Sequence, residues 1–201
     1  MTEDFSKFIS APVLNGEWDL VLDEIFYGCY GFQLFNEEIC DKIINTAEKK
    51  NLWNSGQRET NKDYSTHDML LSDIGNLDIL YNHVLFKIVY PAIIHAYHLE
   101  DILGDQKLDQ RFSPESFIAK YTPDNQAHLG LHHDFSSVTT MLTLNNQFEG
   151  GGTWFFDAKK LVKSKAGYMI FHQGMFTHYH GARPVTKGTR YVIITFNNWN
   201  N

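Results

Sequence analysis

The second half of the chain consists of short runs of β-branched and aromatic residues separated by turn residues, and this pattern constrains the fold most. The runs cover residues 116–121, 132–145, 153–156, 167–171 and 189–197. Many short strands with glycine-rich turns between them are typical of a sandwich or jelly roll. We therefore expect a β-roll over about residues 115–198.

The first half has helical patterns. Asn36 can cap a helix, and an apolar stripe at i, i+3, i+4 and i+7 follows it, which predicts an amphipathic helix to about Lys50. The stripe is formed by Cys40, Ile43, Ile44 and Ala47. A second stripe after Gly75 predicts another helix, and Pro91 should end or kink it. These helices would support the β-roll from about residue 36 to 98.

The remaining segments are less regular. Residues 1–17 look like an arm outside the core, and residues 18–35 are expected to form one or two strands. Residues 51–66 form a long polar connection, in which Trp53 and Tyr64 are candidates for substrate contact. The chain contains no repeat and no linker, so residues 1–201 are expected to form one domain of the α+β class, mainly β.

The composition limits the kinds of partner that the protein is expected to bind. The net charge of −7 disfavours nucleic-acid binding, which needs a basic surface, and fits a basic peptide better. Two cysteines are too few for a disulfide framework. With neither a signal-peptide pattern nor a run of about eighteen apolar residues, we expect no membrane span and a cytoplasmic protein.

Three residues have the pattern of a facial metal triad. His132 and Asp134 are separated by one spacer, and a further histidine follows about fifty residues later. Such a set holds non-haem Fe(II) and leaves open positions on the metal. On an extended strand, residues i and i+2 point to the same side, so both side chains could reach one ion. His178 and His180 are alternative third ligands.

Arg190 follows His180 by ten residues. A guanidinium matches a carboxylate with two parallel hydrogen bonds, so an arginine near such a metal suggests a small organic acid as co-substrate. A hairpin that joins residues 178–180 to 189–196 would place Arg190 near His180. Iron with a keto acid implies an oxygenase.

With these residues in place, the sequence resembles the Fe(II)- and 2-oxoglutarate-dependent dioxygenases, most of all the catalytic domain of procollagen lysyl hydroxylases, with the prolyl 4-hydroxylases as nearest relatives. The resembling blocks are Tyr-Thr-Pro-Asp-Asn-Gln, His-His-Asp-Phe-Ser-Ser, Phe-Glu-Gly-Gly-Gly-Thr, Thr-His-Tyr-His-Gly and Thr-Lys-Gly-Thr-Arg-Tyr. The resemblance implies a double-stranded β-helix core of the jelly-roll, cupin-like kind. It spans roughly residues 30–198.

The resemblance also implies roles for single residues. His132, Asp134 and His180 would hold the iron, because the family places its basic residue ten positions after the distal histidine. Arg190 would bind the far carboxylate of 2-oxoglutarate, and Tyr121 would help to position it.

Strand parity adds two candidates for the co-substrate pocket. Thr139, Met141 and Thr143 should point to one side of a strand, and the two threonines could donate hydrogen bonds to 2-oxoglutarate. Lysyl hydroxylases usually carry an asparagine at the position of Met141, so this part of the pocket differs.

The implied activity is hydroxylation of a peptidyl side chain, most simply lysine in a collagen-like peptide. Asp68 or Glu149 could pair with the lysine ammonium. The expected cofactors are Fe(II), 2-oxoglutarate and O2, with ascorbate in addition. The alternatives are a prolyl 4-hydroxylase and, more distantly, a non-catalytic jelly-roll binding module. The expected partner is a peptide or protein substrate, and the oligomeric state is left open.

Overall fold

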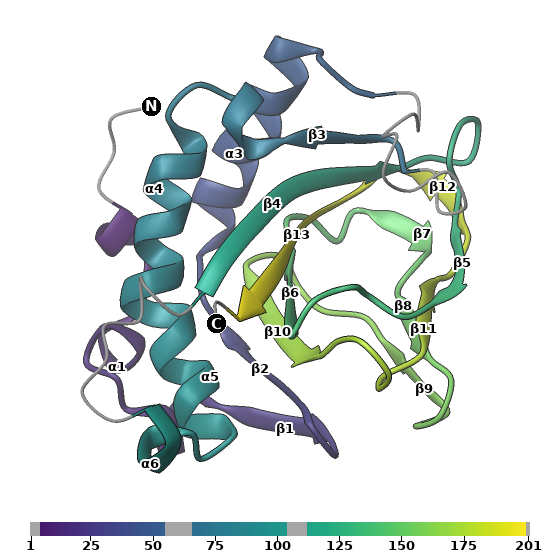
Figure 1. The fold of residues 1–201 in the computed structure, drawn as a ribbon. Coiled ribbons are helices and arrows are strands. Elements are labelled where there is room, and N and C mark those ends of the chain that lie inside the picture. The colour runs from purple at the N-terminus through teal and green to yellow at the C-terminus, as the bar shows by residue number, and fades with distance from the viewer. Residues whose placement is uncertain (1–4, 55–65, 104–111, 200–201) are drawn as a thin grey trace.

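Two antiparallel sheets face each other and helices cover the outer face of the larger one (Figure 1). The computed structural model describes residues 5–54, 66–103 and 112–199. The larger sheet has the strand order β1-β2-β10-β6-β13-β4-β3, the smaller sheet has the order β5-β11-β8-β9, and β12 pairs with β7. This is the jelly-roll arrangement that the strand pattern predicts.

The strands of the larger sheet are β1 (Asp23–Phe26), β2 (Cys29–Gln33), β3 (Asp68–Leu70), β4 (Phe112–Tyr121), β6 (Val138–Thr143), β10 (Tyr168–Gln173) and β13 (Arg190–Trp199). The other strands are β5 (Leu129–His132), β7 (Phe148–Gly150), β8 (Thr153–Phe155), β9 (Lys160–Val162), β11 (His180–Ala182) and β12 (Val185–Gly188). The helical elements are η1 (Phe5–Phe8), α1 (Ala11–Leu14), α2 (Trp18–Val21), α3 (Glu37–Lys50), η2 (Leu71–Asp73), α4 (Leu77–Val84), η3 (Leu85–Val89), α5 (Tyr90–Ala96) and α6 (Glu100–Leu103).

Helix α3 confirms the predicted amphipathic helix. The Asn36 side chain accepts a hydrogen bond from the Ile39 backbone N–H at 3.2 Å, which satisfies one of the free donors of the first turn. Asn51 ends the helix in the left-handed conformation. Ile39, Cys40, Ile43 and Ala47 of its apolar face are buried in the core, and Ile44 is partly buried against it.

Of the two effects predicted for Pro91, an end of the helix is wrong, since the helix continues to Ala96. A π-helical segment, η3, precedes the proline and shifts the hydrogen bonding, so that the Tyr90 N–H bonds to the Leu85 carbonyl. Pro91 then lies in the first turn of α5, where its missing N–H removes no helical hydrogen bond. A helix that is interrupted by a π-turn can therefore carry a proline.

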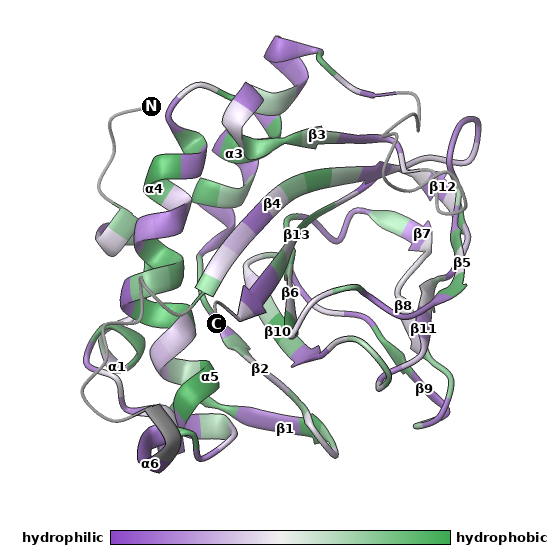
Figure 2. Cartoon of the chain, in the orientation of Figure 1, coloured by the Kyte–Doolittle hydropathy of each residue, from purple (hydrophilic) through white to green (hydrophobic). Residues whose placement is uncertain are grey.

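The combined helix Leu77–Ala96 has 20 residues and is long and apolar enough to cross a membrane, although a buried core helix passes the same test. Figure 2 shows green hydrophobic and purple hydrophilic stretches alternating along α4 and α5. Most apolar residues of the combined helix, Leu77, Tyr81, Ile88 and Ile93 among them, are buried in the core between helices and sheet, whereas Ile79 is exposed.

The prediction that residues 1–17 form an arm outside the core is wrong from Phe5 onward. Phe5, Phe8, Ile9 and Val13 are all buried in the same core as α3. These helical turns are too short to show the regular repeat of apolar residues that marks a longer helix. The sequence pattern therefore does not indicate that their side chains are buried.

A second core lies between the two sheets and borders the candidate site. It contains Phe117, Tyr121, Met141 and Phe155, with further buried residues from β10 and β13. Phe117, Tyr121 and Met141 of this core also line the cavity of the candidate site.

Candidate functional site

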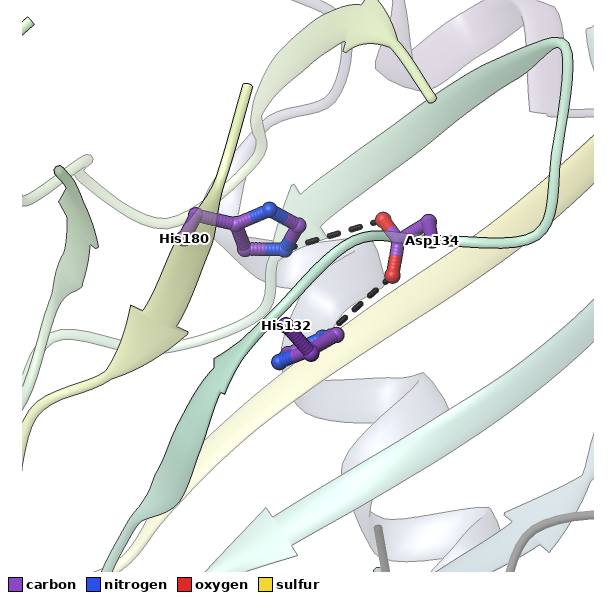
Figure 3. Close-up of side chains that lie close together, drawn as sticks. All are labelled: His132, Asp134 and His180. Carbon is purple, nitrogen blue, oxygen red and sulfur yellow. Dashed lines mark ion pairs between the residues drawn. The ribbon is translucent and has the colours of Figure 1, made fainter. Parts of the chain in front are cut away.

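His132, Asp134 and His180 lie close together in the lining of one cavity (Figure 3). His132 is the last residue of β5 and His180 is the first residue of β11, and the two lie directly opposite each other in the antiparallel ladder. Asp134 follows β5 in the turn toward β6. The expected continuous strand over 132–145 is therefore wrong, because it breaks after His132, yet Asp134 still points to the histidines.

The three side chains have the spacing of a metal site. His132 Nε2 is 3.3 Å from Asp134 Oδ1, and His180 Nε2 is 3.6 Å from Asp134 Oδ2. One ligand atom from each residue lies within 4.8 Å of the other two. Neighbouring ligands on an octahedral ion with bonds of about 2.1 Å are about 3 Å apart, so a modest contraction of the cluster would close it on an ion.

Hydrogen bonds fix which ring nitrogen of each histidine faces the cluster. The Nδ1 atom of His132 is 2.8 Å from the Gly130 carbonyl, and that of His180 is 2.8 Å from the His178 carbonyl. Since a carbonyl only accepts, both Nδ1 atoms carry the hydrogen. Each Nε2 is then left as a lone-pair donor toward the ion, as in many metal sites.

The electrostatics of the metal-free cluster favour an ionised Asp134 and a neutral His180, while the pKa of His132 is raised: burial lowers it, but the hydrogen bond to Asp134 outweighs burial. His132 gives up this proton when a metal binds. Burial raises the pKa of the Asp134 carboxyl, but hydrogen bonding to His132 and the charges of the nearby histidines outweigh it and hold the pKa well below its usual range. Burial lowers the pKa of His180. An ionised carboxylate beside a neutral imidazole is the ligand form that binds divalent iron.

Thr139 supports Asp134. Its hydroxyl donates to Asp134 Oδ2 at 2.7 Å, and its oxygen is 2.7 Å from the Ser136 hydroxyl. Because Thr139 has one hydroxyl hydrogen, Ser136 is the donor in the second contact. The expected use of Thr139 as a hydrogen-bond donor to 2-oxoglutarate therefore competes with an existing bond to the carboxylate.

Arg190 lies in the same cavity as the three clustered residues, and this cavity has a volume of about 300 Å³. The expected hairpin from 178–180 to 189–196 is wrong, since β11 belongs to the smaller sheet and Arg190 begins β13 of the larger one. The residue reaches the cavity from the opposite wall, because the two sheets face each other.

The Arg190 guanidinium is buried, with 4% of the residue exposed, and it lies 5.4 Å from the centre of the Tyr121 ring. Its Nη2 donates to Thr153 Oγ1 at 3.2 Å. Burial lowers its pKa, yet a guanidinium stays charged in proteins. Among the described residues no carboxylate forms an ion pair with it, so this buried charge needs an anionic ligand.

The other predicted co-substrate residues fall into two groups. Tyr121, Thr139 and Met141 line the main cavity, whereas Thr143 lines a smaller space behind Arg190 that also contacts Met141. The predicted parity of β6 is thus confirmed. Thr153, which the sequence analysis did not select, bridges Arg190 and the Met141 sulfur at 3.3 Å.

The two carboxylates that were expected to pair with a lysine substrate differ in burial and in location. Asp68 is 1% exposed and lines the main cavity from β3, and the Thr66 hydroxyl donates a hydrogen bond to it. Glu149 lies on the surface and forms an ion pair with Lys187 at 2.9 Å. Trp53 stacks on His67 away from the cavity lining, and Tyr64 lies outside the described residues.

The other histidines near the cluster lie in different surroundings. His178 lies outside the three-residue cluster and stacks on His172, with ring centres 5.3 Å apart, so His180 is the better third ligand. His133 is exposed beside Tyr179. His172 was missed by the sequence analysis because it follows an apolar run on β10; it is fully buried, and its ring meets that of His180 edge-on at 4.9 Å.

Comparison with known proteins agrees with this geometry. The family model of the 2OG-Fe(II) oxygenase superfamily matches residues 106–198. The chain carries a 2OG-Fe(II) oxygenase domain. It is 30% identical over 191 residues to a procollagen lysyl hydroxylase and glycosyltransferase of Acanthamoeba polyphaga mimivirus. The aligned region covers 90% of this chain and 20% of that protein.

A second relative is procollagen-lysine,2-oxoglutarate 5-dioxygenase 1 of Rattus norvegicus, with 30% identity over 173 residues, 83% of this chain and 23% of the relative. The chain thus spans about a fifth of the length of these relatives. The oxygenase domain is homologous to part of the lysyl hydroxylases.

Solved structures share its fold. The viral collagen prolyl hydroxylase of Paramecium Bursaria Chlorella virus-1 superposes with a TM-score of 0.61 at 16% identity, over 87% of this chain and 97% of that one. A prolyl-4-hydroxylase of Pseudomonas putida superposes with a TM-score of 0.63 at 15% identity, over 95% and 99%. These likenesses support the jelly-roll assignment.

The residues present fit the cofactors of the family. Two imidazoles and a carboxylate suit Fe(II), and a buried arginine with no ion pair among the described residues suits a dicarboxylate in the same cavity.

Proposed function

We propose that this domain hydroxylates the side chain of a lysine residue in a peptide, with Fe(II), 2-oxoglutarate and O2. The observation that carries the proposal is the placement of the His132, Asp134 and His180 cluster and the buried Arg190 in one cavity. Iron and 2-oxoglutarate, when bound, supply the oxidising power, so that one oxygen atom of O2 enters a C–H bond while 2-oxoglutarate becomes succinate and CO2.

The chain's own residues bind and orient the reactants. The three clustered side chains would hold the iron, and Arg190 would hold the far carboxylate of 2-oxoglutarate through two hydrogen bonds. Tyr121, packed against the guanidinium, keeps it in place and closes the wall. The apolar lining from Met141 and Val192 excludes water from this end of the cavity.

Asp68 favours lysine over other substrates. It places a buried carboxylate in the cavity that also contains the metal cluster, and a buried carboxylate is stabilised by a cationic partner. A lysine that enters the cavity would bring its ammonium to Asp68 and leave its methylene groups between Asp68 and the metal. Thr66 would hold the carboxylate in position through its hydroxyl.

A prolyl substrate is the second candidate. The aromatic residues Phe117 and Phe196 line the cavity and pack edge-on, with ring centres 5.4 Å apart, and such a wall suits a pyrrolidine ring. A prolyl residue carries no charge for Asp68, so the buried carboxylate favours lysine.

The test is succinate formation from 2-oxoglutarate with Fe(II) and ascorbate, in the presence of peptides that contain lysine or proline. Mass spectrometry would locate the added oxygen. Oxygen on lysine supports the proposal, oxygen on proline establishes the alternative, and no peptide-dependent turnover contradicts both.

A matched pair of variants then tests the role of Asp68. Asp68→Asn keeps the acceptor for Thr66 but removes the charge, and we expect kcat/KM for a lysine peptide to fall about 30-fold or more, the effect of a lost buried charge pair of about 2 kcal/mol or more. Glu149→Gln is the control, because Glu149 lies on the surface with Lys187. Equal effects of the two variants would exclude Asp68 from lysine recognition.

A further inference from the structure

The lining of the cavity has an acidic side and an apolar side. On the acidic side, the buried Asp68 and the exposed Glu115 bring carboxylates to the lining from β3 and β4 of the larger sheet. On the apolar side, Phe135 reaches the lining from the turn after β5 of the smaller sheet and is 75% exposed. A substrate that enters the cavity therefore meets carboxylates from the larger sheet and an exposed aromatic ring from the turn after β5.

The apolar side extends beyond Phe135. The Met175 backbone N–H donates to the Asp134 carbonyl at 2.6 Å, so the turn after β5 and the turn after β10 lie side by side. Met175 is 44% exposed and Phe176 is 89% exposed. We call Phe135, Met175 and Phe176 the apolar rim.

The folding of the chain does not require this exposure. A phenylalanine ring that is left in water loses the gain from burial that drives core formation, and Phe135 and Phe176 lie on two turns that a backbone hydrogen bond joins. Other exposed apolar residues, such as Leu20 and Ile79, lie singly on helices, as is usual for protein surfaces.

We propose that the apolar rim binds an apolar residue next to the target lysine of the peptide substrate, while Asp68 and Glu115 receive the positive charge. This inference rests on the proposed lysine hydroxylation. The occupant is an extended peptide segment with a lysine and an apolar neighbour, because the rim is continuous with the cavity through Phe135. Side chains next to each other on an extended peptide point in different directions, so the lysine can enter the cavity while its neighbour contacts the exposed rim.

The size of the effect follows from the area of an aromatic ring. Phe176 has nearly its whole surface available, and aromatic side chains dominate the energetics of interfaces because of the area they bury. We expect a peptide with leucine on both sides of the lysine to have a kcat/KM about tenfold higher than the same peptide with serine at those positions.

The experiment measures hydroxylation of these two peptides by the native chain and by the Phe176→Ser and Phe135→Ser variants. Either variant should bring the ratio of the two kcat/KM values close to one. The ratio compares two peptides on one protein, so it is independent of any change in the amount of active protein. Ile79→Ser removes an exposed apolar residue from α4 and should leave the ratio unchanged.

Two results would overturn the inference. If the native chain hydroxylates lysine in both peptides with equal kcat/KM, the apolar rim does not bind the neighbouring residue, although the proposed function stands. If the preference for leucine survives in both rim variants, another surface causes it. Failure to hydroxylate lysine in either peptide would overturn the proposed function, and the docking inference with it.

Discussion

Replacement of Arg190 by methionine should separate ligand binding from folding. The guanidinium is buried beside Tyr121, Met141 and Thr153, so an apolar side chain of similar length fits its surroundings. Loss of one partner of a buried, hydrogen-bonded charge pair costs about 3 kcal/mol. For Arg190→Met this corresponds to a roughly 100-fold higher Kd for 2-oxoglutarate.

The same change should leave the ligand-free protein at least as stable. A buried charge without an ionic partner is unfavourable, and apolar replacement of buried charges is often neutral or stabilising. At a 2-oxoglutarate concentration of 100 times the native Kd, the ligand adds about 2.7 kcal/mol to the native free energy of unfolding. For Arg190→Met the same concentration adds only about 0.4 kcal/mol.

Thermal unfolding with and without 2-oxoglutarate, in the presence of Mn²⁺ as a redox-inactive metal, measures both quantities. Arg183→Met is the control, since Arg183 is exposed between β11 and β12. We expect the variant Arg190→Met to keep its ligand-free midpoint and lose the shift. A large drop in the ligand-free midpoint with an undiminished shift would show that Arg190 stabilises the fold and does not bind the co-substrate.

Three further changes test the site and the fold. His180→Ala should abolish stoichiometric Fe(II) binding while His178→Ala keeps it, as measured by metal content after desalting; the reverse result would make His178 the ligand. Thr139→Val should weaken metal affinity roughly 10- to 100-fold, because Asp134 loses its orienting donor, with little change in the KM for 2-oxoglutarate; a selective rise in that KM would instead support a direct contact. Asn36→Ala should lower the free energy of unfolding by about 1 kcal/mol through loss of the α3 cap, as measured in urea, and an unchanged midpoint would show that the cap contributes nothing.

Local patterns predicted the elements that local physics controls. The cap at Asn36 and the apolar stripe behind it placed α3 correctly, because both signals act within one or two turns. The same holds for the parity of β6, where Thr139 and Met141 share the cavity side. His132 and Asp134 were predictable because iron requires particular side chains at spacings that a short segment can express, whereas the choice of His180 over His178 came from the family resemblance.

Features that depend on distant partners were not predicted. The chain from His180 to Arg190 does not form a hairpin, since β11 pairs with β5 and β8 while β13 pairs with β4 and β6. Both residues reach the same cavity only because the sheets face each other. His172 was missed for a similar reason, as its neighbour His180 comes from the other sheet.

The cross-strand pair of His132 and His180 also bears on the order in which the protein assembles. The two residues are 180 − 132 = 48 positions apart, and they meet only in the ladder of β5 and β11. Contacts between residues so far apart form late, because the intervening chain must first be closed into a loop. A metal ion can therefore find all three donors only on a nearly finished roll. A bound metal ion would link β5 to β11 and stabilise their pairing. Amide hydrogens of these two strands should therefore exchange more slowly in the metal-loaded protein than in the metal-free one.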